Sequence, residues 1–112
     1  MNDEKKYGCG FELTIDIIGG KWKGLILWHL NEQGILRNNQ FLRFIPSITQ
    51  KMLTQQLREM EENSLVSRKI YEQIPPKVEY TLTNHGKKLH AILKDMRQWG
   101  IEYATEYHIP IE

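Results

Sequence analysis

The sequence predicts a mostly α-helical domain that carries a small β-hairpin, an α+β class of fold. Two patterns in its 112 residues predict this. Between residues 11 and 63 the apolar residues recur mainly at three- and four-residue steps, which is the period of an α-helix. Between residues 66 and 82 they alternate with polar residues around two adjacent prolines, as in two strands joined by a turn. A helical pattern returns from residue 84 to about residue 108.

The length and composition fit one soluble domain in a reducing compartment. The chain is 26% charged and 40% hydrophobic, with a net charge of +1. Residues 49–88 hold seven Lys or Arg against five acids, and residues 89–112 hold two against four, so the middle is mildly basic. The first ten residues lack a signal peptide, and no stretch approaches the roughly 18 apolar residues of a membrane span. With a single cysteine and no internal disulfide, we expect a cytoplasmic protein without a membrane partner.

The first expected helix, residues 11–18, has two apolar stripes. One contains Phe11, Ile15 and Ile18, and the other contains Leu13 and Ile17. A helix with two apolar stripes buries one in its own core and the other against a partner. We assign Leu13 and Ile17 to the partner. Two glycines then end the helix.

Residues 21–30 predict the central buried helix, because nearly all of its C-terminal part is apolar. Trp22 and Trp28 are interpreted as core residues rather than as stacking partners for a ligand. Gly34 ends the segment, and residues 35–37 fit a very short strand.

A short helix, a tight turn and a long polar-faced helix are expected next, as in a helix-turn-helix. Asn38 or Asn39 should cap the short helix, residues 40–45, which ends before a proline. Ser47 or Thr49 should cap the long helix, which runs to about residue 63. Its core-facing stripe consists of Met52, Leu53, Leu57 and Met60.

The outward face of that long helix is polar and basic. It consists of Gln50, Lys51, Thr54, Gln55 and Arg58. Such side chains match base edges and phosphates in the major groove of DNA. For an isolated helix, a solvated amphipathic face is the plainer interpretation. The segment that follows this helix favours the DNA-binding interpretation.

That segment alternates between apolar and polar residues in two runs, residues 66–72 and 77–82, with Pro75 and Pro76 between them. We expect a hairpin with a stiff tip. Its basic residues are Arg68, Lys69 and Lys77.

The last expected helix begins after a cap at Thr83 or Asn84 and carries one long apolar stripe at near-heptad spacing. The stripe consists of Leu89, Ile92, Leu93, Met96, Trp99, Tyr103 and Tyr107. One small domain does not need so long an apolar edge, so we expect self-association. The dimer contact should then consist of Leu13, Ile17, Trp99, Tyr103 and Tyr107. The alternative is that these residues only complete the core of the monomer.

Helices followed by a basic hairpin form a winged helix-turn-helix. In such a domain the long helix enters the major groove and the hairpin reaches the neighbouring backbone or minor groove. We divide the single domain, residues 1–112, into dimerisation helices (11–18 and 84–108), a helix-turn-helix (39–63) and a wing (66–82).

The chain resembles the HxlR family of bacterial winged-helix transcriptional regulators. The motifs that carry the resemblance are residues 16–22 (DIIGGKW), 48–61 (ITQKMLTQQLREME), 75–83 (PPKVEYTLT) and 99–100 (WG). The resemblance implies a homodimer, joined through the first and last helices, that binds an inverted-repeat operator and usually regulates a nearby gene.

Mapped onto the reading helix, the resemblance makes Gln55 and Arg58 the candidates for base contacts. Lys51 and Thr54 would contact phosphate or base edges, with Gln50 on the same face. In the hairpin, Lys69 and Lys77 would contact phosphate, and Arg68 would do so if its strand turns it outward. Neither the operator nor any small-molecule effector follows from the sequence.

Cys9 precedes the first helix, where free backbone N–H groups favour a negative charge and hence a thiolate, and Lys5 and Lys6 lie nearby. Some members of the family sense oxidants or electrophiles through a cysteine at this place, by an intersubunit disulfide or an adduct. Here Gly10 replaces the proline that commonly follows it. An inert thiol is the alternative.

Two other classes of function compete. An enzyme is disfavoured because the four histidines stand far apart, and none lies at metal-ligand spacing from another histidine or the cysteine. There is also no glycine-rich phosphate loop and no nucleophile elbow. We therefore expect no metal site and no cofactor. A winged helix that binds protein instead of DNA would carry acids or apolar residues on the outward face, and Lys51 and Arg58 argue against it.

Overall fold

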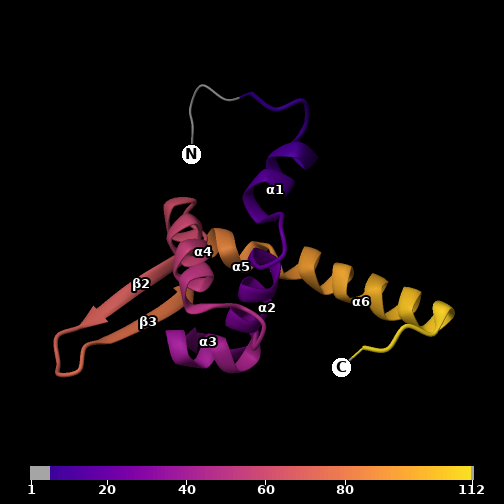
Figure 1. Cartoon of the computed structure of the whole chain (residues 1–112). Helices are drawn as coiled ribbons and strands as arrows, with labels where there is room; N and C mark the ends of the chain where they lie inside the picture. The colour runs from indigo at the N-terminus through magenta and orange to yellow at the C-terminus, as the bar shows by residue number, and fades with distance from the viewer. Residues whose placement is uncertain (1–5, 112) are drawn as a thin grey trace.

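The computed structural model describes residues 6–111, and within them helices precede and follow a hairpin as expected. The elements are α1 (Gly10–Ile18), α2 (Lys23–Gln33), β1 (Ile35–Leu36), α3 (Asn38–Phe44), α4 (Gln50–Glu62), β2 (Val66–Tyr71), β3 (Lys77–Leu82), α5 (Asn84–Lys88) and α6 (His90–Tyr107). Figure 1 shows α2, α3 and α4 at the centre, the hairpin of β2 and β3 projecting to one side, and α6 extending to the other. The predicted winged helix-turn-helix class is confirmed.

The hairpin belongs to a three-stranded antiparallel sheet in the order β1-β3-β2. Two residue pairs, Ile35 with Thr81 and Leu36 with Tyr80, join β1 to β3. The six pairs between β2 and β3 run from Val66 opposite Leu82 to Tyr71 opposite Lys77. The base of the hairpin is anchored in the core, and its far end is free to reach another molecule.

The core lies between α2, α4 and the base of the sheet. Its most deeply buried side chains include Ile26, Leu27, Leu30, Leu36, Phe41, Leu53, Leu57, Met60 and Val66. Each such side chain contributes about 1.5–3 kcal/mol when it leaves water. Trp22 and Trp28 pack against this core but remain partly exposed. Because three residues of α4 are fully buried, the opposite side of α4 has to face outward.

Threonines cap two of the helices. The Thr49 hydroxyl accepts a hydrogen bond from the Met52 N–H at 3.1 Å and so begins α4. Thr83 does the same for the Gly86 N–H at the start of α5. In both cases the sequence had offered two candidates, and the structure selects the threonine. A cap of this kind contributes about 1 kcal/mol.

The predicted cap of α3 is wrong. The helix begins at Asn38, and the preceding Arg37 occupies the N-cap position in an extended conformation. The Gln40 side chain accepts a hydrogen bond from the Arg37 N–H at 2.8 Å. The Gln40 side chain thus provides an acceptor for the free N–H group at the start of the helix. No asparagine cap is needed, and both asparagines lie inside the helix.

The last helical stretch is two helices rather than one. The change of direction falls at Leu89, between α5 and α6. Gly86 holds α5 against the turn before β2, since a Cβ atom there would lie 2.2 Å from the Leu65 carbonyl oxygen. That close approach fixes α5 on the core, while α6 packs on the core through Leu93 and then extends away from it (Figure 1). Within residues 6–111 no helix has the length and apolar character needed to cross a membrane.

Candidate DNA-binding surface

The outward face of α4 gathers all five residues that the sequence assigned to it. Gln50, Lys51, Gln55 and Arg58 are exposed, and Thr54 is half-buried between them. Together with two acids of the same helix they line one continuous shallow depression. The Thr54 hydroxyl donates to the Gln50 carbonyl at 2.9 Å and accepts from the Gln50 side-chain amide at 3.1 Å. These two side chains are therefore ordered before any ligand arrives.

One acid on this surface is neutralised by a residue that the sequence did not single out. Glu59 lines the same depression. Its carboxylate lies 3.0 Å from the Nζ atom of Lys23, whose side chain is 13% exposed. The pair ties α4 to α2 and lowers the repulsion that Glu59 would exert on a phosphate. Lys23 and Glu59 are far apart in the chain, so no local sequence pattern indicates the contact.

Arg68 lies at the junction between α4 and the hairpin. Its Nε atom is 3.7 Å from Glu61 of α4, and it stands opposite Tyr80 in the sheet. Burial raises the pKa of the Tyr80 hydroxyl, and the charges of Arg68 and Arg58 oppose that shift. Both arginines therefore lie close to the same tyrosine. Arg68 faces the reading helix rather than the free outer face of the hairpin.

The outer face of the hairpin carries Lys69, Tyr71, Lys77 and Glu79. The Nζ atoms of Lys69 and Lys77 lie 4.8 and 4.6 Å from the centre of the Tyr71 ring. Lys77 also lies 3.5 Å from the Glu79 carboxylate. A hydrogen bond with Tyr71 lowers the pKa of Glu79, and the charges of Lys77 and Arg37 lower it further. This face therefore presents cations in an ordered cluster.

Reading helix and hairpin thus form one basic surface with two parts. Figure 1 shows α4 beside the hairpin on the side of the molecule away from α6. Two basic residues, Lys69 and Lys77, lie on the outer face of the hairpin, and the five candidates of α4 lie on the helix. Arg68 lies between the two parts. A helix of this kind fits a major groove, and a hairpin beside it meets the flanking backbone.

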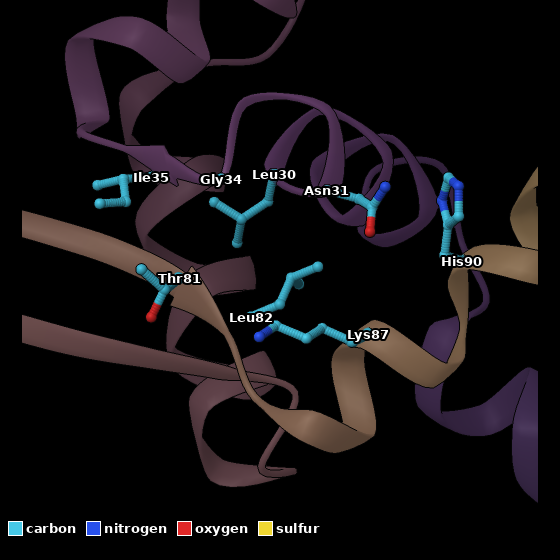
Figure 2. A pocket seen from close by; sticks show the side chains of 8 residues that line it. All are labelled: Leu30, Asn31, Gly34, Ile35, Thr81, Leu82, Lys87 and His90. Atoms are coloured by element: carbon cyan, nitrogen blue, oxygen red, sulfur yellow. The ribbon is translucent and has the colours of Figure 1, made fainter.

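A separate hollow of about 590 Å³ lies between α2, the β1–β3 edge and the α5–α6 turn (Figure 2). Leu30 and Leu82 form its apolar floor, with Thr81 at one end and His90 at the other. The His90 ring stacks on Trp28 at 5.7 Å. The Thr81 hydroxyl and the His90 imidazole therefore lie at opposite ends of the hollow. Among the described residues no group of three or more His, Cys, Asp or Glu could hold a metal ion.

Comparison with known proteins decides the family. The model of the HxlR-like helix-turn-helix matches residues 17–108. The chain belongs to the HxlR family. It is 55% identical over 102 residues to the HTH-type transcriptional regulator YkvN of Bacillus subtilis. The aligned region covers 91% of this chain and 86% of YkvN.

Solved structures agree with the HxlR assignment. The redox regulator HypR in its oxidised form is 51% identical, with a TM-score of 0.78 over 84% of this chain and 96% of HypR. In its reduced form HypR is 48% identical, with a TM-score of 0.81 over 88% of this chain and 96% of HypR. The chain is therefore a DNA-binding transcriptional regulator and not an enzyme.

This HxlR protein exposes a large apolar surface on α1, α2 and α6. Phe11 is 73% exposed and Trp99 is 65% exposed. The Trp99 and Tyr103 rings stack with centroids 5.0 Å apart, and the Tyr107 ring lies tilted against Tyr103 at 4.7 Å. A hollow of about 880 Å³ lies between the three helices. The apolar residues that line it are Phe11, Ile15, Ile18, Leu25, Ile92, Leu93 and Met96.

Within the protomer the two apolar stripes of α1 differ in their burial. Leu13 and Ile17, which the sequence analysis gave to a partner, are half-buried, and Ile17 packs against the core of the protomer. Phe11 and Ile15 are the exposed ones. The reason is that α1 contacts the core through its C-terminal turn, where Ile17 and the buried Ile18 lie side by side. The two apolar stripes in the sequence do not reveal this.

Cys9 is exposed and precedes the range that the HxlR model matches. It is the N-cap residue of α1, and its side chain makes no capping hydrogen bond. Glu12 lies in the first turn of the helix and accepts a hydrogen bond from the Gly8 N–H at 2.8 Å. A carboxylate therefore already occupies the positive end of α1. Lys6 is exposed nearby, and Lys5 lies outside the described residues.

Proposed function

We propose that this regulator binds an inverted-repeat operator as a homodimer. One observation carries the proposal: an ordered, exposed face of α4 lies beside a hairpin whose cations face outward. Placing α4 in the major groove brings the hairpin to the adjacent backbone. In this arrangement residues 39–63 read the site, residues 66–82 form the wing, and residues 11–18 and 84–108 join the subunits.

We assign a role to each candidate contact. Gln55 and Arg58 contact base edges, because they are exposed and because amide and guanidinium groups match adenine and guanine edges. Lys51 and Thr54 contact phosphate or base edges beside them, and Gln50 is held by Thr54. Lys69 and Lys77 contact phosphate from the wing. Arg68 lies between α4 and the wing.

Selection of bound fragments from genomic DNA tests the proposal. The expected product is an inverted repeat whose half-sites lie about one duplex turn, roughly 34 Å, or a multiple of it apart. Arg58→Ala should weaken binding to the selected site by about 1–3 kcal/mol and relax discrimination. Lys77→Ala should weaken all duplexes about equally and reduce the salt slope by about one. No enrichment of any fragment, with no retention of bulk duplex at low salt, would favour a protein-binding role instead.

The homodimer is supported by the apolar surface of α1, α2 and α6. Large exposed apolar patches that include aromatic residues mark sites of protein association. Trp99, Tyr103 and Tyr107 extend this patch along α6. We expect sedimentation to give a dimer at micromolar concentration. Met96→Asp should shift it toward monomer, whereas Ala91→Asp, an exposed change on the same helix, should not. A wild-type monomer would refute the dimer.

A second function, redox sensing through Cys9, is favoured by the similarity to the redox regulator HypR. An oxidant such as diamide takes two electrons and two protons from two Cys9 thiols, and an S–S bond forms between subunits. Non-reducing gels should show a covalent dimer that Cys9→Ser abolishes, with altered binding to the selected duplex. A Cys9 that stays free under oxidant and alkylates readily only at alkaline pH would identify an inert, unactivated thiol.

A further inference from the structure

Two lysines of the wing share one tyrosine ring. The Nζ atom of Lys69 lies 4.8 Å from the centre of the Tyr71 ring, and that of Lys77 lies 4.6 Å from it. The strand register produces this arrangement, because Tyr71 is directly opposite Lys77, and Lys69 precedes it by two residues on the same face. The electron-rich ring face attracts both ammonium groups.

Glu79 belongs to the same cluster. It lies opposite Lys69 in the sheet, and the Tyr71 hydroxyl lowers the pKa of its carboxyl group. Its carboxylate is also 3.5 Å from the Lys77 ammonium group. The side chains of Lys77 and Glu79 are only 26% and 17% exposed. Lys77 is thus held on two sides, by the ring and by the carboxylate, although it lies next to the hairpin tip.

The cluster keeps an excess of positive charge. Glu79 is one acid among three cations, since Arg37 also acts on its carboxylate. An approaching phosphate therefore meets a net attractive field. Lysine loses considerable rotamer freedom when it is fixed by a ligand, and prior ordering reduces that cost.

We propose that Tyr71 is a positioning residue for DNA binding: its ring holds Lys69 and Lys77 so that both ammonium groups reach backbone phosphates together. The ring itself contacts no phosphate. This inference rests on the proposed function, in which the two lysines contact phosphate. It adds a residue that carries no charge and that a survey of basic side chains would overlook.

The free protein provides the first test. Ring currents of Tyr71 should shift the ε-methylene proton signals of Lys69 and Lys77 upfield in carbon–proton correlation spectra. Tyr71→Phe keeps the ring and should keep both shifts, whereas Tyr71→Leu should move both signals to ordinary lysine positions. Unshifted lysine signals in the wild type would overturn the proposal whether or not DNA binds.

The second test is a mutant cycle on DNA. The probe is a fluorescein-labelled duplex of arbitrary sequence, roughly 30 base pairs or three turns long, at several salt concentrations. Tyr71→Leu should weaken binding by about three- to tenfold and lower the salt slope, while Tyr71→Phe stays within about twofold of wild type. In a Lys69→Gln/Lys77→Gln background, Tyr71→Leu should have no further effect. Lys94→Gln, a distant change on α6, controls for net charge.

The outcomes separate this inference from the proposed function. If Lys69→Gln/Lys77→Gln binds as tightly as wild type with the same slope, the lysines do not contact DNA, and the proposed wing contact fails. If that variant is weakened but Tyr71→Leu loses as much in its background as in wild type, Tyr71 acts on stability rather than on the lysines. Thermal unfolding of both tyrosine variants checks that each is folded at the assay temperature.

Discussion

The ion pair between Lys23 and Glu59 connects α2 to α4, the helix that we propose to read DNA. Removing the pair should affect stability and DNA binding in separable ways. At the observed 3.0 Å, two unit charges attract by roughly 5 kcal/mol for an effective dielectric constant of about 20. Ordering and desolvation cancel most of this, and exposed pairs retain only about 0.2–1 kcal/mol. Because the side chain of Lys23 is 13% exposed but that of Glu59 is 40% exposed, we expect about 1 kcal/mol.

Urea unfolding of wild type, Lys23→Met, Glu59→Gln and the double variant measures this coupling directly. The two single changes should each lower the free energy of unfolding, and the double variant should lose less than their sum by about 1 kcal/mol. Purely additive losses would contradict an interaction between the two side chains.

DNA binding should separate the two single variants. In Lys23→Met, Glu59 is left as an unpaired negative charge on the reading face, so affinity for a duplex should fall. In Glu59→Gln, that charge is gone and Lys23 remains, so affinity should be equal to wild type or higher. Equal losses in both variants would show that the pair acts only by holding α4 in place.

Three further changes test the fold around the site. Thr49→Ala removes the cap of α4 and should cost about 1 kcal/mol in urea unfolding, whereas Ser47→Ala, which removes no observed cap, should be nearly neutral. Gly86→Ala places a Cβ atom 2.2 Å from a backbone oxygen and should lower the melting temperature strongly, whereas Gly10→Ala, with open space around its Cβ, should not. The pKa of Glu79 is lowered in the folded state, so its stabilising effect is present at neutral pH and is lost as the pH falls below about 4.5 toward the folded pKa. Acid unfolding of Glu79→Gln should therefore show a weaker pH dependence in that range than wild type, and identical profiles would contradict a lowered pKa for Glu79.

The outward face of α4 could be predicted from sequence because it depends on a single helical period. Once Leu53 and Leu57 are buried, the positions of Gln55 and Arg58 follow from geometry alone. The hairpin could be predicted for the same kind of reason, since alternation and two prolines define it locally. By contrast, the contact between Lys23 and Glu59 joins two helices that are far apart in the sequence, so no periodic pattern of residues predicts it. The cluster around Tyr71 depends on the exact strand register, which the sequence pattern left open.

The terminal helix α1 shows most clearly where local patterns stop being sufficient. Both of its stripes are apolar, so hydrophobicity cannot decide which one the protomer buries. Tertiary packing determines which residues of α1 are buried. The short α1 contacts the core at its C-terminal turn, where Ile18 is buried and Ile17 packs beside it. Phe11 and Ile15, nearer the N-terminal end, then extend past the core and line the hollow with α2 and α6. A contact between copies of this chain should therefore use Phe11 and Ile15 more than Leu13 and Ile17. Phe11→Ser should weaken self-association in sedimentation more than Leu13→Ser does, and the reverse order would show that the helix repacks when a second subunit binds.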